Sequence, residues 1–265
     1  PHLINLTATP IPRTLALGLF GEIEITNIPN KPKNHLPVKT WVVNPTRFKK
    51  SDSWLQDRLK AGSKVFVISP LIHSSEKAKD LASTEKIRQI YQRKFGEKFP
   101  VHLIHGQLKP DKIEAELKLF RQAITGILVS TTLIEVGIDI PEADVIIIHS
   151  AERFGLAQLH QLRGRVGRGH RQGYCLLVPT TDDQQEEERL KLLEKYHSGL
   201  VLAKKDLKLR GAGELFGEKQ HGWIPVRLKN FWNKNLFLKA KKTATEMVAL
   251  DQNESLAIAN KLVTW

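Results

Sequence analysis

The sequence predicts an α/β protein with a doubly wound parallel sheet, and two observations lead to this prediction. Short apolar runs recur along the middle of the chain, and they are nearly continuous where half-exposed strands would alternate with polar residues. Continuous runs are typical of parallel strands that helices cover on both faces. Amphipathic segments separate these runs, so strands and helices alternate over roughly 150 residues, a common domain size.

The elements follow one another in a regular order. In the segment Pro110–Gln122, the apolar residues Ile113, Leu117 and Phe120 recur at i, i+4 and i+7 and therefore share one helical face. Proline is favoured in the first turn of a helix, so Pro110 marks the start. The expected strands are Thr40–Val43, Val65–Ser69, Val101–His105, Gly126–Ser130, Val145–His149 and Tyr174–Val178. The other expected helices are Ser51–Ala61 and Glu76–Phe95. In the second of these helices, the residues expected to face inward are Ala78, Leu81, Ile87, Ile90 and Tyr91.

Changes of composition divide the chain into three expected parts. Residues 1–30 lead into a linker rich in proline and lysine. Residues 31–181 hold the alternating strands and helices. Residues 182–265 open with acidic side chains, which favour the start of a helix. The residues expected to face inward in that helix are Leu190, Leu193 and Tyr196.

Composition limits the classes of function. The formal net charge of +13 and the pI of about 9.8 favour a polyanionic partner, above all nucleic acid, although a basic surface without such a partner gives the same numbers. The single cysteine, Cys175, excludes a disulfide framework and a thiol-rich metal site within the chain, and it is expected to be buried. The histidines show no spacing typical of metal ligands. No apolar run is long enough to span a bilayer, so we expect a cytoplasmic protein without a membrane partner.

The run Gln158–Gly169 (QLHQLRGRVGRG) carries the strongest chemical signal. It places Arg163, Arg165 and Arg168 among glycines directly after a helical segment. Arginine keeps its charge and presents five donors in a rigid fork, so a cluster of this kind suits phosphate. Glycine lets other groups approach the backbone closely. The simpler interpretation is a solvated basic turn.

The spacing Gln-x-x-Gly-Arg-x-Gly-Arg within this run resembles motif VI of superfamily 2 helicases. The chain is similar to these proteins elsewhere too, and the matching segments cover nearly its whole length. In chain order they are Leu6–Thr14 (motif III), Ile104–Pro110, Ile127–Pro141 (motif V) and Asp206–Gly222, which resembles the translocation motif of the RecG and Mfd families. The segment Pro70–Ile87 resembles the RecG pattern more than that of Mfd. The resemblance implies a RecA-like second motor domain of the P-loop NTPase type, followed by a helical hairpin and a loop.

The resemblance also implies roles for individual residues. Arg165 and Arg168 would reach across a cleft to the triphosphate of ATP, with Gln161 ordering that contact. The other implied contacts are Gly137 and Asp139 with the nucleotide, and Thr131, Thr132, His105 and Gly106 with the DNA backbone. From the residues alone, the threonines could instead cap a helix, and Asp139 could cap the turn before Pro141. Arg163 could pair with an acidic residue or face DNA.

A third group of residues is implied to couple nucleotide state to DNA movement. Thr7, Ala8 and Thr9 would belong to the end of a first motor domain. A hairpin of helices near Arg189–Lys208 would lead into a glycine-rich loop. The coupling residues of that loop would be Arg210, Glu214 and Gln220. A purely structural helix–loop–helix tail is the alternative.

The sequence also lacks motifs that an ATP-driven motor needs. It contains neither a Gly-x-x-x-x-Gly-Lys-Ser/Thr phosphate loop nor an Asp-Glu-x-His magnesium motif. By the family pattern, both belong to a first motor domain that would precede Pro1 and hold ATP and Mg²⁺, and a wedge domain would lie further towards the N-terminus. We therefore expect the C-terminal part of a monomeric ATP-dependent helicase that acts on branched or double-stranded DNA. A non-catalytic basic module that binds nucleic acid remains the alternative of another class, while no Gly-x-Gly-x-x-Gly motif supports an independent nucleotide enzyme.

Overall fold

The chain divides into two compact units, and the sheet lies in the first, which extends to Asp206. In the second unit, residues 242–246 are helical and Lys242 lies 3.8 Å from Glu246. The computed structural model describes residues 36–70, 77–131, 140–169, 171–181 and 183–210, together with Thr26, Lys239 and residues 242–246.

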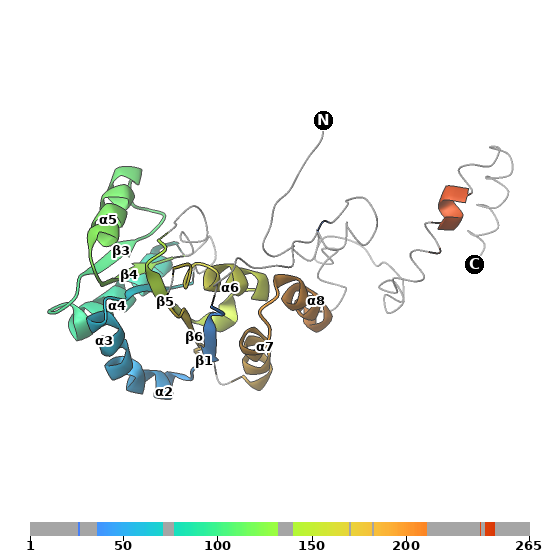
Figure 1. The fold of residues 1–265 in the computed structure, drawn as a ribbon, viewed down its shortest axis with the longest axis horizontal. Helices are drawn as coiled ribbons and strands as arrows, with labels where there is room; N and C mark the ends of the chain where they lie inside the picture. Colours follow the sequence, from blue (N-terminus) through green and yellow to red (C-terminus); the bar gives the residue numbers. More distant parts are fainter. Residues whose placement is uncertain are drawn as a thin grey trace. The chain divides into compact units, whose positions relative to one another are not determined.

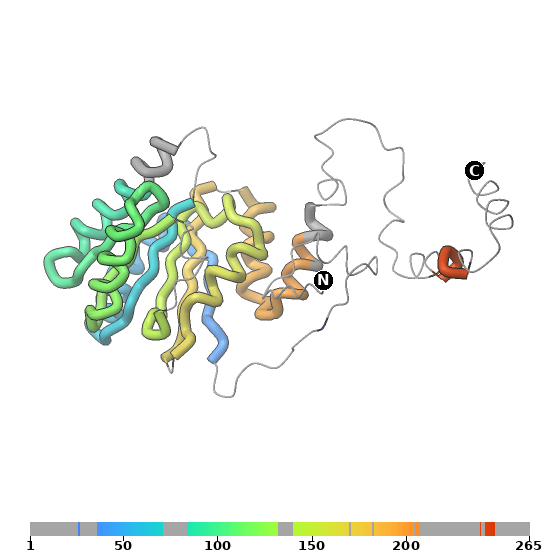
Figure 2. Tube along the Cα trace, turned by 90° about the horizontal axis from the view of Figure 1, so that it is seen from above, coloured from blue at the N-terminus to red at the C-terminus, as the bar shows by residue number. Residues whose placement is uncertain are grey.

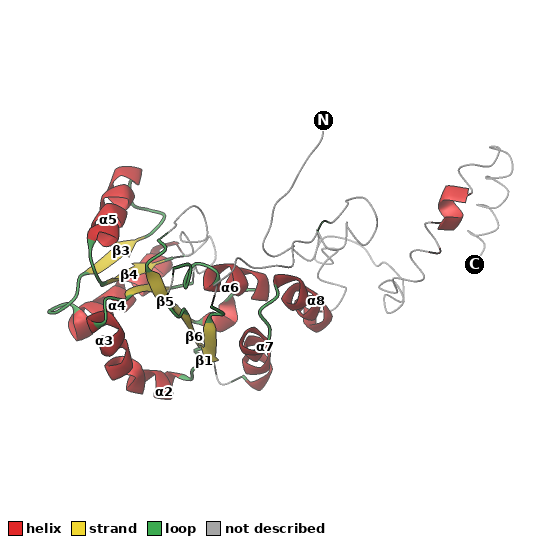
Figure 3. Ribbon diagram, viewed as in Figure 1, coloured by secondary structure: helices red, strands yellow, loops and turns green. Residues whose placement is uncertain are grey.

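Within the described residues, six parallel strands form one sheet in the order β1-β6-β5-β2-β4-β3 (Figures 1 and 3). Helices lie in the connections β1–β2, β2–β3, β3–β4 and β5–β6, as parallel neighbours require. This arrangement confirms the predicted doubly wound α/β fold. The strands are β1 (Lys39–Val42), β2 (Lys64–Ile68), β3 (Val101–Ile104), β4 (Gly126–Ser130), β5 (Ala143–His149) and β6 (Tyr174–Val178).

Helices cover both faces of the sheet (Figure 2). Helices α5, α6 and α7 pack on one face and α3 and α4 on the other. The helices are α2 (Pro45–Phe48), α3 (Asp52–Lys60), α4 (Lys77–Phe95), α5 (Pro110–Gln122), α6 (Leu156–Arg163), α7 (Gln184–Lys195) and α8 (Gly199–Arg210), with short 3₁₀ turns η1 (Lys49–Ser51) and η3 (Ala151–Arg153). The pair α7 and α8 supplies the predicted helical hairpin.

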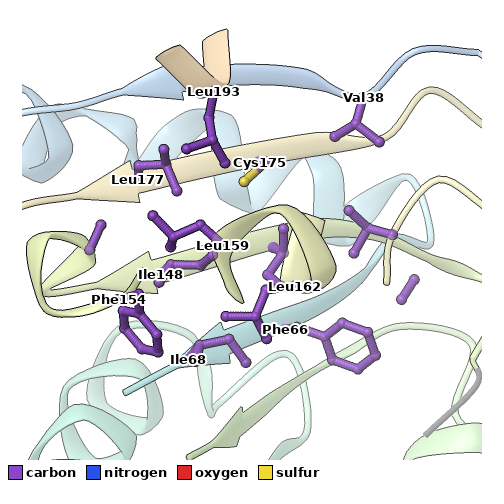
Figure 4. Close-up of a cluster of buried hydrophobic side chains, with 14 of the residues drawn as sticks. Val38, Phe66, Ile68, Ile148, Phe154, Leu159, Leu162, Cys175, Leu177 and Leu193 are labelled. Atoms are coloured by element: carbon purple, nitrogen blue, oxygen red, sulfur yellow. The ribbon is translucent and has the colours of Figure 1, made fainter. Parts of the chain in front are cut away.

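Successive residues of the central strands point to opposite faces and form two separate cores. In β2, Phe66 and Ile68 pack under α5 and α6, while Val65 and Val67 pack under α3 and α4. Figure 4 shows Phe66 and Ile68 in the first core, below Leu159 of α6. Because Val65–Ile68 of β2 are buried on both faces of the sheet, they form a continuous apolar run after the buried Lys64.

Most of the side chains predicted to face inward do so. The stripe of α5 packs on the first core, with Phe120 fully buried, and both Leu190 and Leu193 of α7 are buried. Cys175 is also buried, as predicted, and burial raises the pKa of its thiol to about 12. The prediction was wrong for Ile90, which is 48% exposed, because α4 turns only the side containing Ile87 and Tyr91 towards the sheet.

His149, at the end of β5, is enclosed by aromatic side chains. Its Nε2 atom lies 3.1 Å from the hydroxyl group of Tyr91, and the ring of Phe48 meets it edge-on. Burial, together with the smaller effect of the nearby positive charge of Lys94, lowers the pKa of His149 to about 4. The imidazole is therefore neutral in the folded protein at neutral pH.

This environment predicts a loss of stability in mild acid. The ordinary pKa of 6.5 applies to the unfolded chain and about 4 to the folded chain, so between these values the unfolded state binds more protons. As pH falls from 7 to 5, the free energy of unfolding should decrease by about 2 kcal/mol more in the unaltered chain than in His149→Phe. Urea denaturation of both proteins at each pH measures the difference. If the free energy of unfolding changed equally with pH in the two proteins, the low pKa of His149 would be contradicted.

Candidate functional site

The arginine–glycine loop, defined as residues 164–169, lies at the amino end of the sheet. After β5 the chain turns sharply at Ser150, whose φ of 49° is left-handed, and passes through η3 into α6. Helix α6 then runs back across the sheet, so the loop that follows it returns to the start of β5. There the backbone N–H of Gly167 donates a hydrogen bond of 3.0 Å to the carbonyl group of Ala143.

Close backbone packing explains two glycines of this loop. Gly167 has a φ of +68°, and a Cβ atom there would lie 2.9 Å from the Cα atom of Gly173. A Cβ atom on Gly169 would lie 3.0 Å from the carbonyl oxygen of Pro141. Between the arginines, Val166 is 1% exposed and anchors the loop in the core. The loop is therefore fixed at several points along its length.

The two arginines with predicted phosphate contacts remain accessible on this anchored loop. Arg168 is exposed and Arg165 is half-buried. The Nε atom of Arg168 donates to the carbonyl group of Gly164 at 2.9 Å, which orients its guanidinium group. Gln161 is half-buried on the last turn of α6, four residues before Arg165. The structure thus presents two cations from one short loop, an arrangement that suits the oxygens of a phosphate group.

Arg163 has a different role from either of those suggested by the sequence. It is only 4% exposed. Its Nη1 atom donates to the carbonyl groups of Leu193 and Tyr196, at 2.6 and 3.1 Å, where α7 ends. Its Nη2 atom lies 2.7 Å from Nδ1 of His160, which must accept because a guanidinium group only donates. Arg163 therefore pairs with neither an acidic residue nor an exposed partner; it joins α6 to α7.

A second arginine, the half-buried Arg189 of α7, joins α7 to the segment just before α6. Its Nη2 and Nη1 atoms donate to the carbonyl groups of Glu152 and Phe154, at 2.7 and 3.0 Å, and its Nε atom donates to Glu186. Sequence reasoning missed the roles of Arg163 and Arg189. For Arg189 the available signal was its position, because it stands beside Leu190, which was predicted to face inward.

The predicted DNA contacts gather at the opposite, carboxyl end of the sheet. His105 follows β3 and Thr131 follows β4, and the last residues of these strands, Ile104 and Ser130, are register partners. His105 is 8% exposed and Thr131 is 4% exposed. Gly106 is exposed, and a Cβ atom there would meet nothing within 4 Å. The hydroxyl groups of Ser69 and Ser130 are buried at this end without hydrogen-bond partners.

The structure therefore places the site residues in two groups at opposite ends of the sheet. Gln161, Arg165 and Arg168 form the first group, and His105, Gly106 and Thr131 form the second. Arg210 is the last residue of α8, and its side chain lies outside the described residues. The other predicted site residues also lie outside them: Thr7, Ala8, Thr9, Thr132, Gly137, Asp139, Glu214 and Gln220.

In the described part of the chain, no group of three or more histidine, cysteine, aspartate or glutamate side chains could hold a metal ion. Among the helices described, none is both long enough and apolar enough to cross a membrane.

The chain is similar in sequence to known helicases. Residues 49–170 match the family described as Helicase conserved C-terminal domain. The chain is 41% identical to the ATP-dependent DNA helicase RecG of Synechocystis over 96% of this chain and 30% of the relative. It is 43% identical to RecG of Streptococcus pneumoniae over 84% of this chain and 33% of the relative. A solved structure of RecG bound to a three-way DNA junction matches with a TM-score of 0.64 and 33% identity, over 86% of this chain and 29% of that one.

The fold is that of a helicase C-terminal domain, the family whose model matches residues 49–170. Within that class the chain is similar to the RecG helicases. It spans about a third of the length of the curated relatives that it matches.

The buried bonds of Arg163 predict a stability effect. Lysine keeps the charge but lacks the planar fork, so Arg163→Lys should leave at least one helix-end carbonyl group unpaired and lower the free energy of unfolding by about 2 kcal/mol. Urea denaturation measures this change. Arg121→Lys, at an exposed position in the last turn of α5, is the matched control and should change it by less than about 0.5 kcal/mol. Equal effects of the two substitutions would show that the bonds of Arg163 contribute little.

Proposed function

We propose that this chain is the C-terminal motor portion of an ATP-dependent double-stranded DNA translocase and helicase of the RecG type. The observation that carries the proposal is the arginine–glycine loop, which presents Arg165 and Arg168 from a backbone fixed by Val166 and Gly167. In phosphoryl transfer a protein contributes mainly positioning and charge stabilisation, and oriented arginines provide both.

The chain supplies one half of the proposed ATP site. Arg165 and Arg168 act as arginine fingers on the γ-phosphate, Gln161 orders them, and Gly137 and Asp139 contact the nucleotide. The phosphate loop and the Mg²⁺ ligands belong to a first motor domain. Two facts support this division: the 265 residues contain no phosphate-loop motif, and the relatives are about three times as long.

The carboxyl end of the sheet is the proposed DNA surface. Thr131 and Thr132, with His105 and Gly106, contact the phosphate backbone there. Open parallel sheets commonly bind ligands at this end, and the net charge of +13 favours a polyanion. The related RecG structure holds a three-way DNA junction, which supports branched DNA as the substrate. We further propose that the complete protein is a cytoplasmic monomer with an N-terminal wedge domain.

Helices α7 and α8 are proposed to connect ATP hydrolysis to DNA movement. Arg163 and Arg189 join α7 to both ends of α6, so movement of the arginine–glycine loop moves α7 with it. Helix α8 continues towards the proposed coupling loop, which contains Arg210, Glu214 and Gln220. Thr7, Ala8 and Thr9 transmit nucleotide state from the first motor domain. In this proposal, residues 1–30 belong to that domain and its linker, residues 31–181 form the second motor domain, and residues 182–265 form the translocation element.

Substitution of an arginine finger tests the proposal directly. In a protein that includes the first motor domain, Arg168→Ala should reduce DNA-stimulated ATP hydrolysis about 10³-fold, because one cation would be missing from the transition state. Binding of a labelled branched DNA should change by less than about twofold, since one of many phosphate contacts at most is affected. Arg153→Ala removes an exposed arginine beside α6 and is the matched control. Normal turnover in Arg168→Ala would refute the assignment.

The isolated chain gives a second test. Without a phosphate loop, the 265-residue chain should hydrolyse ATP no faster than the buffer background, with or without DNA. A coupled phosphate-release assay measures this rate. A rate that exceeds the background and depends on Arg168 would place a complete active site in this chain and contradict the division between two domains.

A further inference from the structure

The edge of the sheet formed by β1 carries an exposed aromatic side chain. Trp41 is the third residue of β1 and is 42% exposed. Its register partner in β6 is Leu176, so Trp41 points to the face of the sheet on which α3 and α4 pack. Figure 1 shows β1 at the edge of the sheet opposite β3, the strand that precedes the proposed DNA contact His105. The proposed motor function does not use this surface.

Trp41 belongs to a group of aromatic rings from β1, β6 and α3. Its indole ring stacks on the ring of Tyr174, with an angle of 13° between the planes and 6.0 Å between the centroids. The ring of Trp54 meets Tyr174 edge-on, with 5.5 Å between the centroids. Tyr174 and Trp54 are half-buried, whereas Trp41 is exposed. The inner rings therefore support the indole ring of Trp41 and leave part of its surface free for another ring.

Positive charges accompany these rings. The guanidinium group of Arg58 lies 5.6 Å from the centroid of the Tyr174 ring. Lys39 is exposed and is the register partner of Tyr174. Because Lys39 stands two residues before Trp41 in the strand, both side chains point to the same face of the sheet. Three more exposed cations follow in α2 and η1: Arg47, Lys49 and Lys50.

Negative charge is scarce in this part of the chain. Residues 25–51 contain six lysines and arginines but no aspartate or glutamate. The two acidic residues of α3, Asp52 and Asp57, each lie beside a lysine, at 2.6 and 3.8 Å. The carboxylate of Glu194 pairs with the edge of β1, but it comes from α7, on the other face of the sheet. The distribution of charge therefore favours an anionic partner.

An exposed ring beside cations indicates the class of ligand. Every nucleobase has a flat face that can stack on an aromatic side chain, and the phosphate groups next to the base pair with lysine and arginine. In a duplex the faces of the bases are stacked on one another, so only an unpaired nucleotide offers a free face. An apolar segment of a protein would also cover an indole ring, but it would leave the cations without partners.

We propose that the surface formed by Lys39, Trp41, Arg58 and Tyr174 binds single-stranded DNA. One base lies on the free part of the Trp41 ring, and the adjoining phosphate groups pair with Lys39 and Arg58. The proposed helicase function supplies such strands, because separation of a duplex produces them. The binding itself requires neither ATP nor the contacts at the carboxyl end of the sheet, so it goes beyond that function.

Oligonucleotides with and without bases test the proposal on the unaltered 265-residue chain in the absence of ATP. A short fluorescein-labelled thymidine strand should bind at least tenfold more tightly than an abasic strand of the same length, as measured by fluorescence anisotropy, because at least one stacked base is lost. Equal affinities, or no binding of the thymidine strand, would overturn the proposal. Since ATP is absent, this outcome is independent of the test on Arg168.

Variants of Trp41 locate the stacked base. Trp41→Ala should bind the thymidine strand about tenfold more weakly, while Trp41→Phe, which keeps an aromatic ring, should stay within about threefold of the unaltered chain. Leu119→Ala removes an apolar side chain of α5 that is 54% exposed, and it is the matched control with unchanged affinity. Thermal unfolding shows whether each variant is folded. Unchanged affinity in folded Trp41→Ala would contradict the proposal.

Photochemical cross-linking gives a second measurement that needs no substitution. A strand that carries iododeoxyuridine in place of thymidine is irradiated on the unaltered chain, and mass spectrometry identifies the linked residue. A cross-link to Trp41 is expected, because an iodinated base reacts with an aromatic ring on which it stacks. Cross-links that all lie elsewhere in the chain would overturn the proposal, even if Trp41→Ala does not fold.

The phosphate contacts and the alternative ligands are tested on the same surface. Lys39→Gln should reduce the slope of log affinity against log salt concentration by about 0.7, whereas Lys118→Gln, at an exposed position of α5, should not change it. Trp41→Ala should change the affinity for a blunt duplex by less than about twofold. An equal loss for duplex and single strand would contradict binding of an unpaired base. If Trp41→Ala abolished self-association in sedimentation and left DNA binding unchanged, the surface would be a protein interface and the proposal would be wrong.

Discussion

The bonds that Arg163 donates to the end of α7 are the constraint on which the described site depends. A buried guanidinium group is costly unless its donors are satisfied, and here the satisfying acceptors are the carbonyl groups of Leu193 and Tyr196, which α7 leaves unpaired at its end. The same interaction therefore satisfies the end of α7 and fixes the last turn of α6. Because Arg165 and Arg168 follow that turn directly, their position relative to α7 is set by Arg163 and supported by Arg189.

This constraint explains why helix α7 belongs to the same compact unit as the sheet. Besides its bonds to α6, α7 packs Leu190 and Leu193 in the core, and Glu194 accepts a hydrogen bond from the backbone N–H of Val42 in the edge strand β1. An edge strand exposes unpaired backbone donors and acceptors, and the carboxylate of Glu194 pairs with one of these donors. Helix α7 thus protects the edge of the sheet and also fixes the arginine–glycine loop. A displacement of α7 would disturb both, which favours movement of the whole unit over local rearrangement.

Sequence patterns predicted the fold well because its strands obey a simple rule. The middle of a strand that is buried on both faces is apolar, as in β2, β4 and β5, whose polar residues lie at or near their ends. The apolar stripe of α5, formed by Ile113, Leu117 and Phe120, predicted its buried face equally well. Ile90 was misjudged because an isolated helix gives no measure of how wide its buried side is. The arginine–glycine spacing predicted phosphate contacts for Arg165 and Arg168. It did not show that Arg163 has a different, structural role. All three have the same chemistry in sequence, and only the distance to the end of α7 distinguishes the buried one.

The separation of the site residues follows from the path of α6. A helix that connects two parallel strands must return the chain from the carboxyl end to the amino end of the sheet, so a loop after α6 cannot lie beside the loops after β3 and β4. Under the proposed function, phosphate contacts and DNA contacts therefore occupy opposite ends of one rigid body. The buried, tightly packed sheet between them has no room for a continuous deformation. Nucleotide-dependent movement at one end must then reach the DNA as rotation of the whole domain, and its direction is set by whatever the arginine–glycine loop contacts on the first motor domain.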